Sequence, residues 1–95
     1  QNVLLGFGAG FALAAGSNNV MIGKDAGSST NSGGQNVIIG QYSGITNTSG
    51  SRLVLIGDNS NVGAAGLTNA IAIGYNASVT NSNQMVLGGT GSDVV

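Results

Sequence analysis

"NVIIG", residues 36–40, recurs in close variants along the whole chain. The variants are NVLLG at 2–6, NVMIG at 19–23, LVLIG at 53–57 and AIAIG at 70–74, and each copy starts 17 residues after the one before. A fixed period of this kind is typical of solenoid proteins, in which each repeat forms one coil that packs on its neighbours. The chain is therefore predicted to be an all-β solenoid with coils of 17 residues.

The coils can be laid out by numbering the positions of each repeat from 1 to 17, beginning at Gln1. They are predicted to cover residues 1–17, 18–34, 35–51, 52–68 and 69–83, with a partial sixth coil from Gln84. The fifth coil is two residues short, which places the deletion in a loop. Residues 1–95 are thus interpreted as a single repeat domain, and because the chain starts inside a repeat, we expect it to be a fragment of a longer protein.

Positions three and five of the coils hold β-branched or large apolar residues. Side chains two residues apart in a strand lie on the same face, and residues of this type favour strands. These two positions are therefore predicted to fill the interior of each coil. The predicted core residues are Val3, Leu5, Val20, Ile22, Val37, Ile39, Val54, Ile56, Ile71 and Ile73.

Position four, between them, is apolar as well. An unbroken apolar run indicates that both faces of the strand are buried. Because one coil cannot bury both of its faces alone, the sequence predicts an oligomer in which position four packs against neighbouring chains. The predicted inter-chain residues are Leu4, Met21, Ile38, Leu55 and Leu87.

Position six is glycine in every coil, which indicates a turn with positive φ or a close approach between backbones. The predicted turn glycines are Gly6, Gly23, Gly40, Gly57, Gly74 and Gly89. Position eleven predicts a second short strand, from Phe11, Ile45, Val62 and Val79. At position two, Asn2, Asn19 and Asn36 are placed to form a ladder of side-chain amides between coils.

Composition excludes several classes of function. Only 5% of the residues are charged and the net charge is -1, and the two basic residues, Lys24 and Arg52, do not cluster, so nucleic acid is not an expected partner. The apolar runs are far shorter than the roughly 18 to 20 residues that span a bilayer, so membrane insertion is not expected. The chain has no His and no Cys, so the usual nucleophile and base pairs cannot form.

No catalytic residue, metal site or cofactor is therefore predicted, and the chain is not expected to be an enzyme. Its acids, Asp25, Asp58 and Asp93, lie in different coils. GGTGSDVV at 88–95 fits one copy of the calcium-binding nonapeptide pattern, but such sites need successive copies, so a terminal turn is the favoured interpretation. DNSN at 58–61 is interpreted as a solvated turn.

Three surface features bear on binding. Phe7, Tyr42 and Tyr75 could stack on sugar rings, although covering the coil edges is the favoured role. The threonines are scattered over several positions, which argues against ice binding. Asn47 and Asn76 fit the N-glycosylation pattern.

The repeat resembles a known group of proteins, most clearly in NAIAIGYNASVTNSNQMVLGG, residues 69–89. This stretch resembles the head repeats of trimeric autotransporter adhesins, the YadA-like heads, and is also similar to repeats of phage tail-fibre proteins. The resemblance implies a left-handed parallel β-roll with three chains around one axis, in an extracellular fibre on a cell surface or virion. Adhesin heads commonly have a shorter repeat, which favours phage fibres or a related surface filament.

The function expected from these observations is that of a structural and adhesive segment of a homotrimeric extracellular fibre. It would act as a rigid spacer, with a glycan or protein receptor bound by loops at 28–34, 46–51 and 62–68. A chain that stacks end to end into a filament is the alternative, because open strand edges invite further pairing. An enzyme acting on polysaccharide would need acids from different chains and is the least supported possibility.

Overall fold

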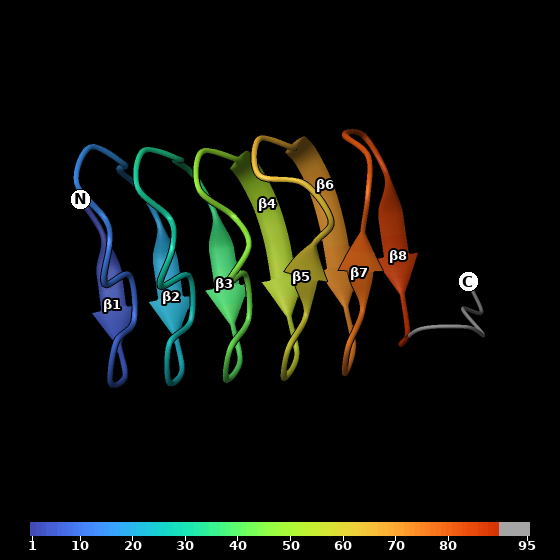
Figure 1. Cartoon of the computed structure of the whole chain (residues 1–95), viewed down its shortest axis with the longest axis horizontal. Helices are drawn as coiled ribbons and strands as arrows, with labels where there is room; N and C mark the ends of the chain where they lie inside the picture. Colours follow the sequence, from blue (N-terminus) through green and yellow to red (C-terminus); the bar gives the residue numbers. More distant parts are fainter. Residues whose placement is uncertain (90–95) are drawn as a thin grey trace.

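The computed structural model describes residues 1–89, and this part of the chain consists of β-strands and turns without a helix (Figure 1). Six parallel strands form the main sheet in the order β1-β2-β3-β4-β6-β8, and two short strands, β5 and β7, pair on the opposite side of the coil. The strands are β1 (Val3–Leu5), β2 (Val20–Ile22), β3 (Val37–Ile39), β4 (Ser51–Ile56), β5 (Asn61–Val62), β6 (Thr68–Ile73), β7 (Ser78–Val79) and β8 (Met85–Leu87). The predicted all-β solenoid is confirmed, with about five turns.

The 17-residue period sets the strand register. Val3 pairs with Val20, Val20 with Val37 and Val37 with Val54, so the same coil position repeats along the stack. The main-chain hydrogen bonds between strands therefore run along the stacking axis, from one coil to the next. Each coil is held by its two neighbours, as expected for a repeat protein.

The core lies on the inner face of the main sheet, and position four fills it. Met21, Ile38, Leu55 and Ala72 are all fully buried inside the single chain. On the same face of β4 and β6, Leu53 and Ala70 are buried beside them, and the core is completed by Ala26, Val62, Ala77 and Val79 from outside the main sheet. The prediction that position four contacts other chains is therefore wrong for Met21, Ile38 and Leu55.

Positions three and five point out of the coil instead. The predicted core residues Val3 and Leu5 are exposed, and the remaining members are half-buried on the outer face of the sheet: Val20, Ile22, Val37, Ile39, Val54, Ile56, Ile71 and Ile73. The inside and outside of the coil were thus exchanged in the prediction. The physical reason is alternation along the strand: the inside of the coil has room for the side chains of positions two and four, which leaves positions three and five on the outside.

Position ten explains how that room arises. It is glycine in the first three coils, and it lies directly opposite position four. A Cβ added to Gly27 would lie 2.6 Å from Sδ of Met21, and one added to Gly44 would lie 3.1 Å from Cδ1 of Ile38. The absence of a side chain at position ten therefore makes space for the large position-four side chain.

The position-six glycines have the predicted role in the first five coils. Their φ angles lie between +129° and +135°, a region that side-chain-bearing residues rarely adopt. A Cβ on Gly6 would also lie 2.6 Å from the carbonyl oxygen of Gly23 in the next coil. Position six therefore requires glycine for two reasons, the dihedral angle and the close approach of the neighbouring backbone.

The sixth coil begins one residue earlier than predicted. β8 pairs Met85 with Ile71, Val86 with Ala72 and Leu87 with Ile73, which is a step of 14 residues. Leu87 is therefore at position five, on the outer face, and not at the inward position four. The position-six glycine is Gly88, with φ +99°, and not Gly89. The remaining residues of the calcium-like pattern, including Asp93, lie outside the described part of the chain.

The predicted second strand forms only in the fourth and fifth coils. β5 and β7 pair Val62 with Val79, and both side chains are buried. In the first three coils, glycine at position ten has φ between +61° and +67° and turns the chain. The following residue then points outward, which leaves Phe11 84% exposed and Ile45 37% exposed.

The predicted asparagine ladder is present and lies beside the core. Asn19 and Asn36 are buried, and the Oδ1 of each asparagine accepts a hydrogen bond from the main-chain N–H at position two of the next coil. The side-chain amide of Asn36 also donates to the carbonyl oxygen of Gly50 at 2.9 Å. The ladder ends at Leu53, whose N–H donates to Oδ1 of Asn36 at 2.9 Å. Most of its bonds therefore join side chain to main chain.

Replacing Asn36 with Ala is expected to destabilise the chain by about 2 to 3 kcal/mol, because the Leu53 N–H and the Gly50 carbonyl lose their side-chain partner in a buried site. Urea unfolding followed by circular dichroism measures the change. Asn31→Ala is the control, since Asn31 is exposed and its amide makes one 3.3 Å bond, so its effect should stay within about 0.5 kcal/mol. Equal losses in both variants would contradict a structural role for the ladder.

Candidate interaction surfaces

The described part of the chain has neither a ligand pocket nor a cluster of three potential metal-ligating side chains. Within residues 1–89 the acids are Asp25 and Asp58, which lie two coils apart on the turns that follow β2 and β4. A helix that could span a bilayer is absent from these described residues. Candidate sites therefore have to be sought on the outer surfaces of the coils.

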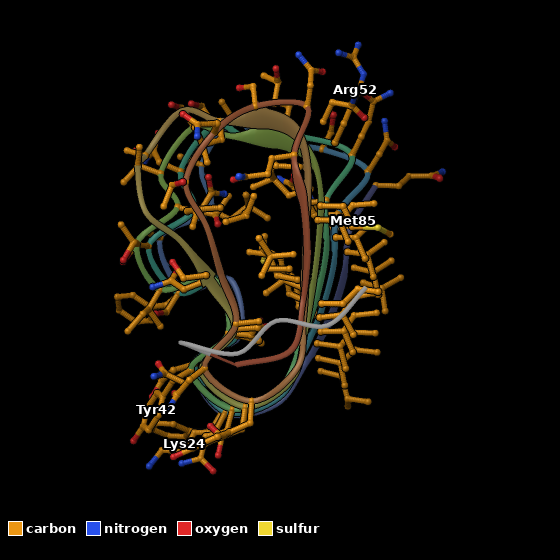
Figure 2. The ribbon with its side chains drawn as sticks, turned by 90° about the vertical axis from the view of Figure 1, so that its right-hand side faces the viewer. Lys24, Tyr42, Arg52 and Met85 are labelled. Carbon is orange, nitrogen blue, oxygen red and sulfur yellow. The ribbon has the colours of Figure 1, made fainter. Side chains whose placement is uncertain are left out.

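The first surface is the outer face of the main sheet, which we call the aliphatic face. It consists of Val3, Leu5, Val20, Ile22, Val37, Ile39, Val54, Ile56, Ile71, Ile73, Met85 and Leu87. Figure 2 shows these side chains as a ladder projecting from the sheet, with Met85 labelled among them. All twelve are aliphatic or thioether side chains, and none is charged.

The aliphatic face is regular because the strands are in register. Neighbouring strands lie about 4.8 Å apart and side chains two residues apart are separated by about 6.6 Å, so six coils present a strip about 24 Å long with two columns of side chains. Leu5 is 63% exposed and Met85 is 52% exposed, while the side chains between them shield one another. A continuous apolar strip of this kind marks a contact surface in soluble proteins.

The second surface is the turn edge, which follows the main sheet at positions seven and eight. It consists of Phe7, Gly8, Lys24, Asp25, Gln41, Tyr42, Asp58, Asn59, Tyr75 and Asn76. Nζ of Lys24 lies over the ring of Tyr42, 5.6 Å from its centroid, in a cation–π contact. Nδ2 of Asn59 donates to Oδ1 of Asn76 at 2.7 Å, which joins the fourth coil to the fifth.

Position eight of the turn edge has an unusual backbone. Asp25, Tyr42, Asn59 and Asn76 have φ between +56° and +59°, and Gly8 has φ +73°. Gly, Asn and Asp adopt this left-handed region readily, whereas a tyrosine does so at a cost in free energy. The sequence identified Tyr42 and Tyr75 as candidate surface aromatics, but the left-handed turn and the contact with Lys24 depend on how the coils stack.

The third surface contains the predicted binding loops, 28–34, 46–51 and 62–68. These loops lead into the starts of the strands, at the end of the coil where Figure 2 shows Arg52, opposite Lys24 and Tyr42. Several loop side chains are used internally: Nδ2 of Asn47 donates to Oγ1 of Thr30 at 3.2 Å, and Oδ1 of Asn47 accepts from the N–H of Gly50 at 2.9 Å. What the loops offer to a partner is exposed Asn, Ser, Thr, Gly and Ala.

The two N-glycosylation patterns differ in accessibility. Asn47 is fully buried in the folded chain, so its amide cannot receive a glycan without local unfolding. Asn76 is half-buried on the turn edge, where its Oδ1 accepts a hydrogen bond from Nδ2 of Asn59. The sequence pattern alone gave both sites the same weight.

Comparisons of the chain with protein-family models, with curated protein sequences and with solved structures gave no match. What this protein does therefore has to be inferred from its own residues and their arrangement.

Proposed function

We propose that the chain is a rigid structural and adhesive segment of an extracellular fibre, in which three copies wind around one axis as left-handed β-rolls. The observation that carries this proposal is the aliphatic face, twelve uncharged apolar side chains in two columns on the outside of the main sheet. In the proposed assembly this face is the contact between copies. Positions three and five would then contact the neighbouring chains, in place of position four, for which the sequence predicted this contact.

Burial of this face supplies the driving force for assembly. Apolar surface removed from water contributes about 25 cal/mol per Å², and Leu5, Ile39 and Met85 all expose part of their side chains in the single chain. Each further coil adds one residue to each column, so the contact grows with the number of coils. A contact that lengthens with the rod suits a fibre better than a compact complex.

The shape of the face favours a ring of chains, and the resemblance of the repeats sets their number at three. A symmetry axis parallel to the stack keeps all copies running in the same direction, and a head-to-tail contact closes into a ring when the rotation permits. The face has two columns, so each copy can offer position three to one neighbour and position five to the other. The resemblance of residues 69–89 to trimeric adhesin heads and tail-fibre repeats supports the same number and an extracellular location.

The mass of the chain in solution tests this proposal. Light scattering after size exclusion, over a range of concentrations, is expected to give a constant value three times the 9.2 kDa of one chain. A constant mass of one chain would overturn the proposal. A mass that rises with concentration would instead favour a solenoid that stacks end to end into a filament.

Ile39→Asp is expected to convert the trimer to a folded monomer, because a charge on the aliphatic face would have to be buried without a partner in the assembly. The same size-exclusion experiment detects the fall to 9.2 kDa. The matched control is Gln41→Asp, two residues further on, since Gln41 is exposed at position seven and Asp58 occupies that position in the next coil. A trimer that survives Ile39→Asp would show that this face is not the contact.

A further inference from the structure

We propose that the turn edge binds a neutral oligosaccharide that runs along the stacking axis, with Tyr42 and Tyr75 as its two stacking platforms. The inference deepens the adhesive role proposed above and rests on it, but it does not depend on the number of chains. It also places the contact with the ligand at the opposite end of the coil from the loops that the sequence favoured.

The backbone of Tyr42 is the first observation that points to a ligand. Its φ is +56°, and the other described coils place Gly8, Asp25, Asn59 and Asn76 at this position. Those residue types accept left-handed angles, whereas a bulky aromatic residue there stores strain, which is common where a side chain serves a function. An asparagine would form the same turn without that strain, so the turn itself does not explain the tyrosine.

The position of the Tyr42 ring is the second observation. The ammonium group of Lys24 lies over one face of the ring, 5.6 Å from the centroid, and limits its orientation. Tyr42 is 37% exposed, which leaves part of the residue open to a ligand. Two coils further along, at about 10 Å by the strand spacing, Tyr75 is 68% exposed.

Polar groups occupy the coil between the two tyrosines. Asp58 and Asn59 are exposed there, and the 2.7 Å bond from Asn59 to Asn76 holds both side-chain amides in place. This bond leaves Oδ1 of Asn59 as an acceptor and Nδ2 of Asn76 as a donor. Sugar hydroxyls both donate and accept hydrogen bonds, so these polar groups can bind them. Two aromatic rings with polar groups between them therefore match a short oligosaccharide.

Charge and position separate this ligand from other classes. Asp25 and Asp58 outnumber Lys24 on the turn edge, which disfavours phosphate-rich or other strongly anionic chains. Figure 2 shows Lys24 and Tyr42 projecting away from the side on which Met85 lies. A contact between copies through the aliphatic face therefore leaves the turn edge open to solvent.

Binding to an array of neutral linear and branched oligosaccharides, with affinities measured for the strongest binders, tests the inference. The test variant is the double substitution Tyr42→Asn and Tyr75→Gln, which uses residues already present at these positions in Asn59 and Gln41. We expect the affinity to fall about tenfold or more. Phe11→Ser is the control, because Phe11 is an exposed aromatic away from the turn edge and Ser28 occupies its position in the next coil; it should bind as the unchanged chain does.

Two results would overturn the inference: no binding to any oligosaccharide on the array, or equal binding by the double variant. The mass of each protein is measured in parallel and keeps the two proposals apart. A chain that is trimeric but binds no oligosaccharide contradicts this inference and leaves the proposed trimeric fibre unaffected. A monomer whose binding depends on the two tyrosines contradicts the trimer and leaves the inference standing.

Discussion

Ile38→Asp is expected to abolish the folded state of the chain. Ile38 is fully buried at position four, in line with Met21 and Leu55 and opposite Gly44. The substitution removes a large apolar side chain, which costs about 2 to 5 kcal/mol, and introduces a carboxylate with no partner, which costs several kcal/mol more even if it is protonated. The sum approaches the whole stability of a small domain, about 5 to 15 kcal/mol.

Circular dichroism and urea unfolding, measured beside two controls, test this expectation. Ile38→Val keeps the apolar contact and should cost about 1 kcal/mol. Ile39→Asp places the same charge on the aliphatic face, where it reaches water, so the single chain should keep its β-sheet spectrum. A folded Ile38→Asp protein together with an unfolded Ile39→Asp protein would show that position three and five side chains, and not position four, fill the coil.

The period of the fold could be read from the sequence, but the orientation of its strands could not. Five copies of a pentapeptide define the register without any knowledge of packing, which is why the pairing of Val20 with Val37 was predictable. Positions three, four and five are all apolar, so the alternation that normally distinguishes the inner face from the outer face is missing. Hydrophobicity therefore fits either orientation equally well.

Two other positions held the missing information. Asn36 is at position two, and alternation along a strand puts it on the same face as Ile38. A buried asparagine needs several hydrogen-bond partners, and main-chain groups of neighbouring coils provide them. Gly44, at position ten, makes the space that Ile38 fills. The asparagine at position two and the glycine at position ten both make contacts across the coil. Their meaning becomes clear only when it is known which residues lie opposite each other.

The shift in the last coil has a similar cause. MVLGG contains two glycines, and the sequence offers no reason to prefer Gly89 over Gly88 as the turn. The structure gives Asn83 a φ of +61°, close to the +54° of Asn69, so Asn83 is the first position of its coil. The turn glycine is then Gly88, and the fifth coil is three residues shorter than the others.

The turn edge was visible in the sequence only as scattered aromatic residues. Tyr42 and Tyr75 differ by one coil position, so no column of aromatics appears when the repeats are aligned. They reach the same edge because the chain turns tightly after the position-six glycine. Surface sites built from side chains of different coils depend on such stacking, which a repeat alignment does not convey.

Gly23→Ala is expected to destabilise the chain by about 3 to 5 kcal/mol, as both backbone strain and steric overlap oppose the new methyl group. Gly23 has φ +129°, an angle that only glycine adopts readily. An added Cβ would lie 2.7 Å from the carbonyl oxygen of Gly40 and 2.8 Å from its carbonyl carbon. Relief of this overlap would require the coils to separate, which weakens the 2.8 Å hydrogen bond from Gly40 N–H to Ile22 carbonyl oxygen.

Urea unfolding of Gly23→Ala beside Gly66→Ala separates this effect from the general effect of adding a methyl group. Gly66 is exposed, does not have a positive φ, and an added Cβ there would meet only Oγ of Ser49, at 3.4 Å. Its substitution should therefore change stability by no more than about 0.5 kcal/mol. Because the glycine turn recurs in every described coil, a large loss at Gly23 alone indicates that close stacking at position six holds the solenoid together. If the two variants unfold at the same urea concentration, the coils can separate at this turn without cost, and the close contact at position six contributes little to the stability of the stack.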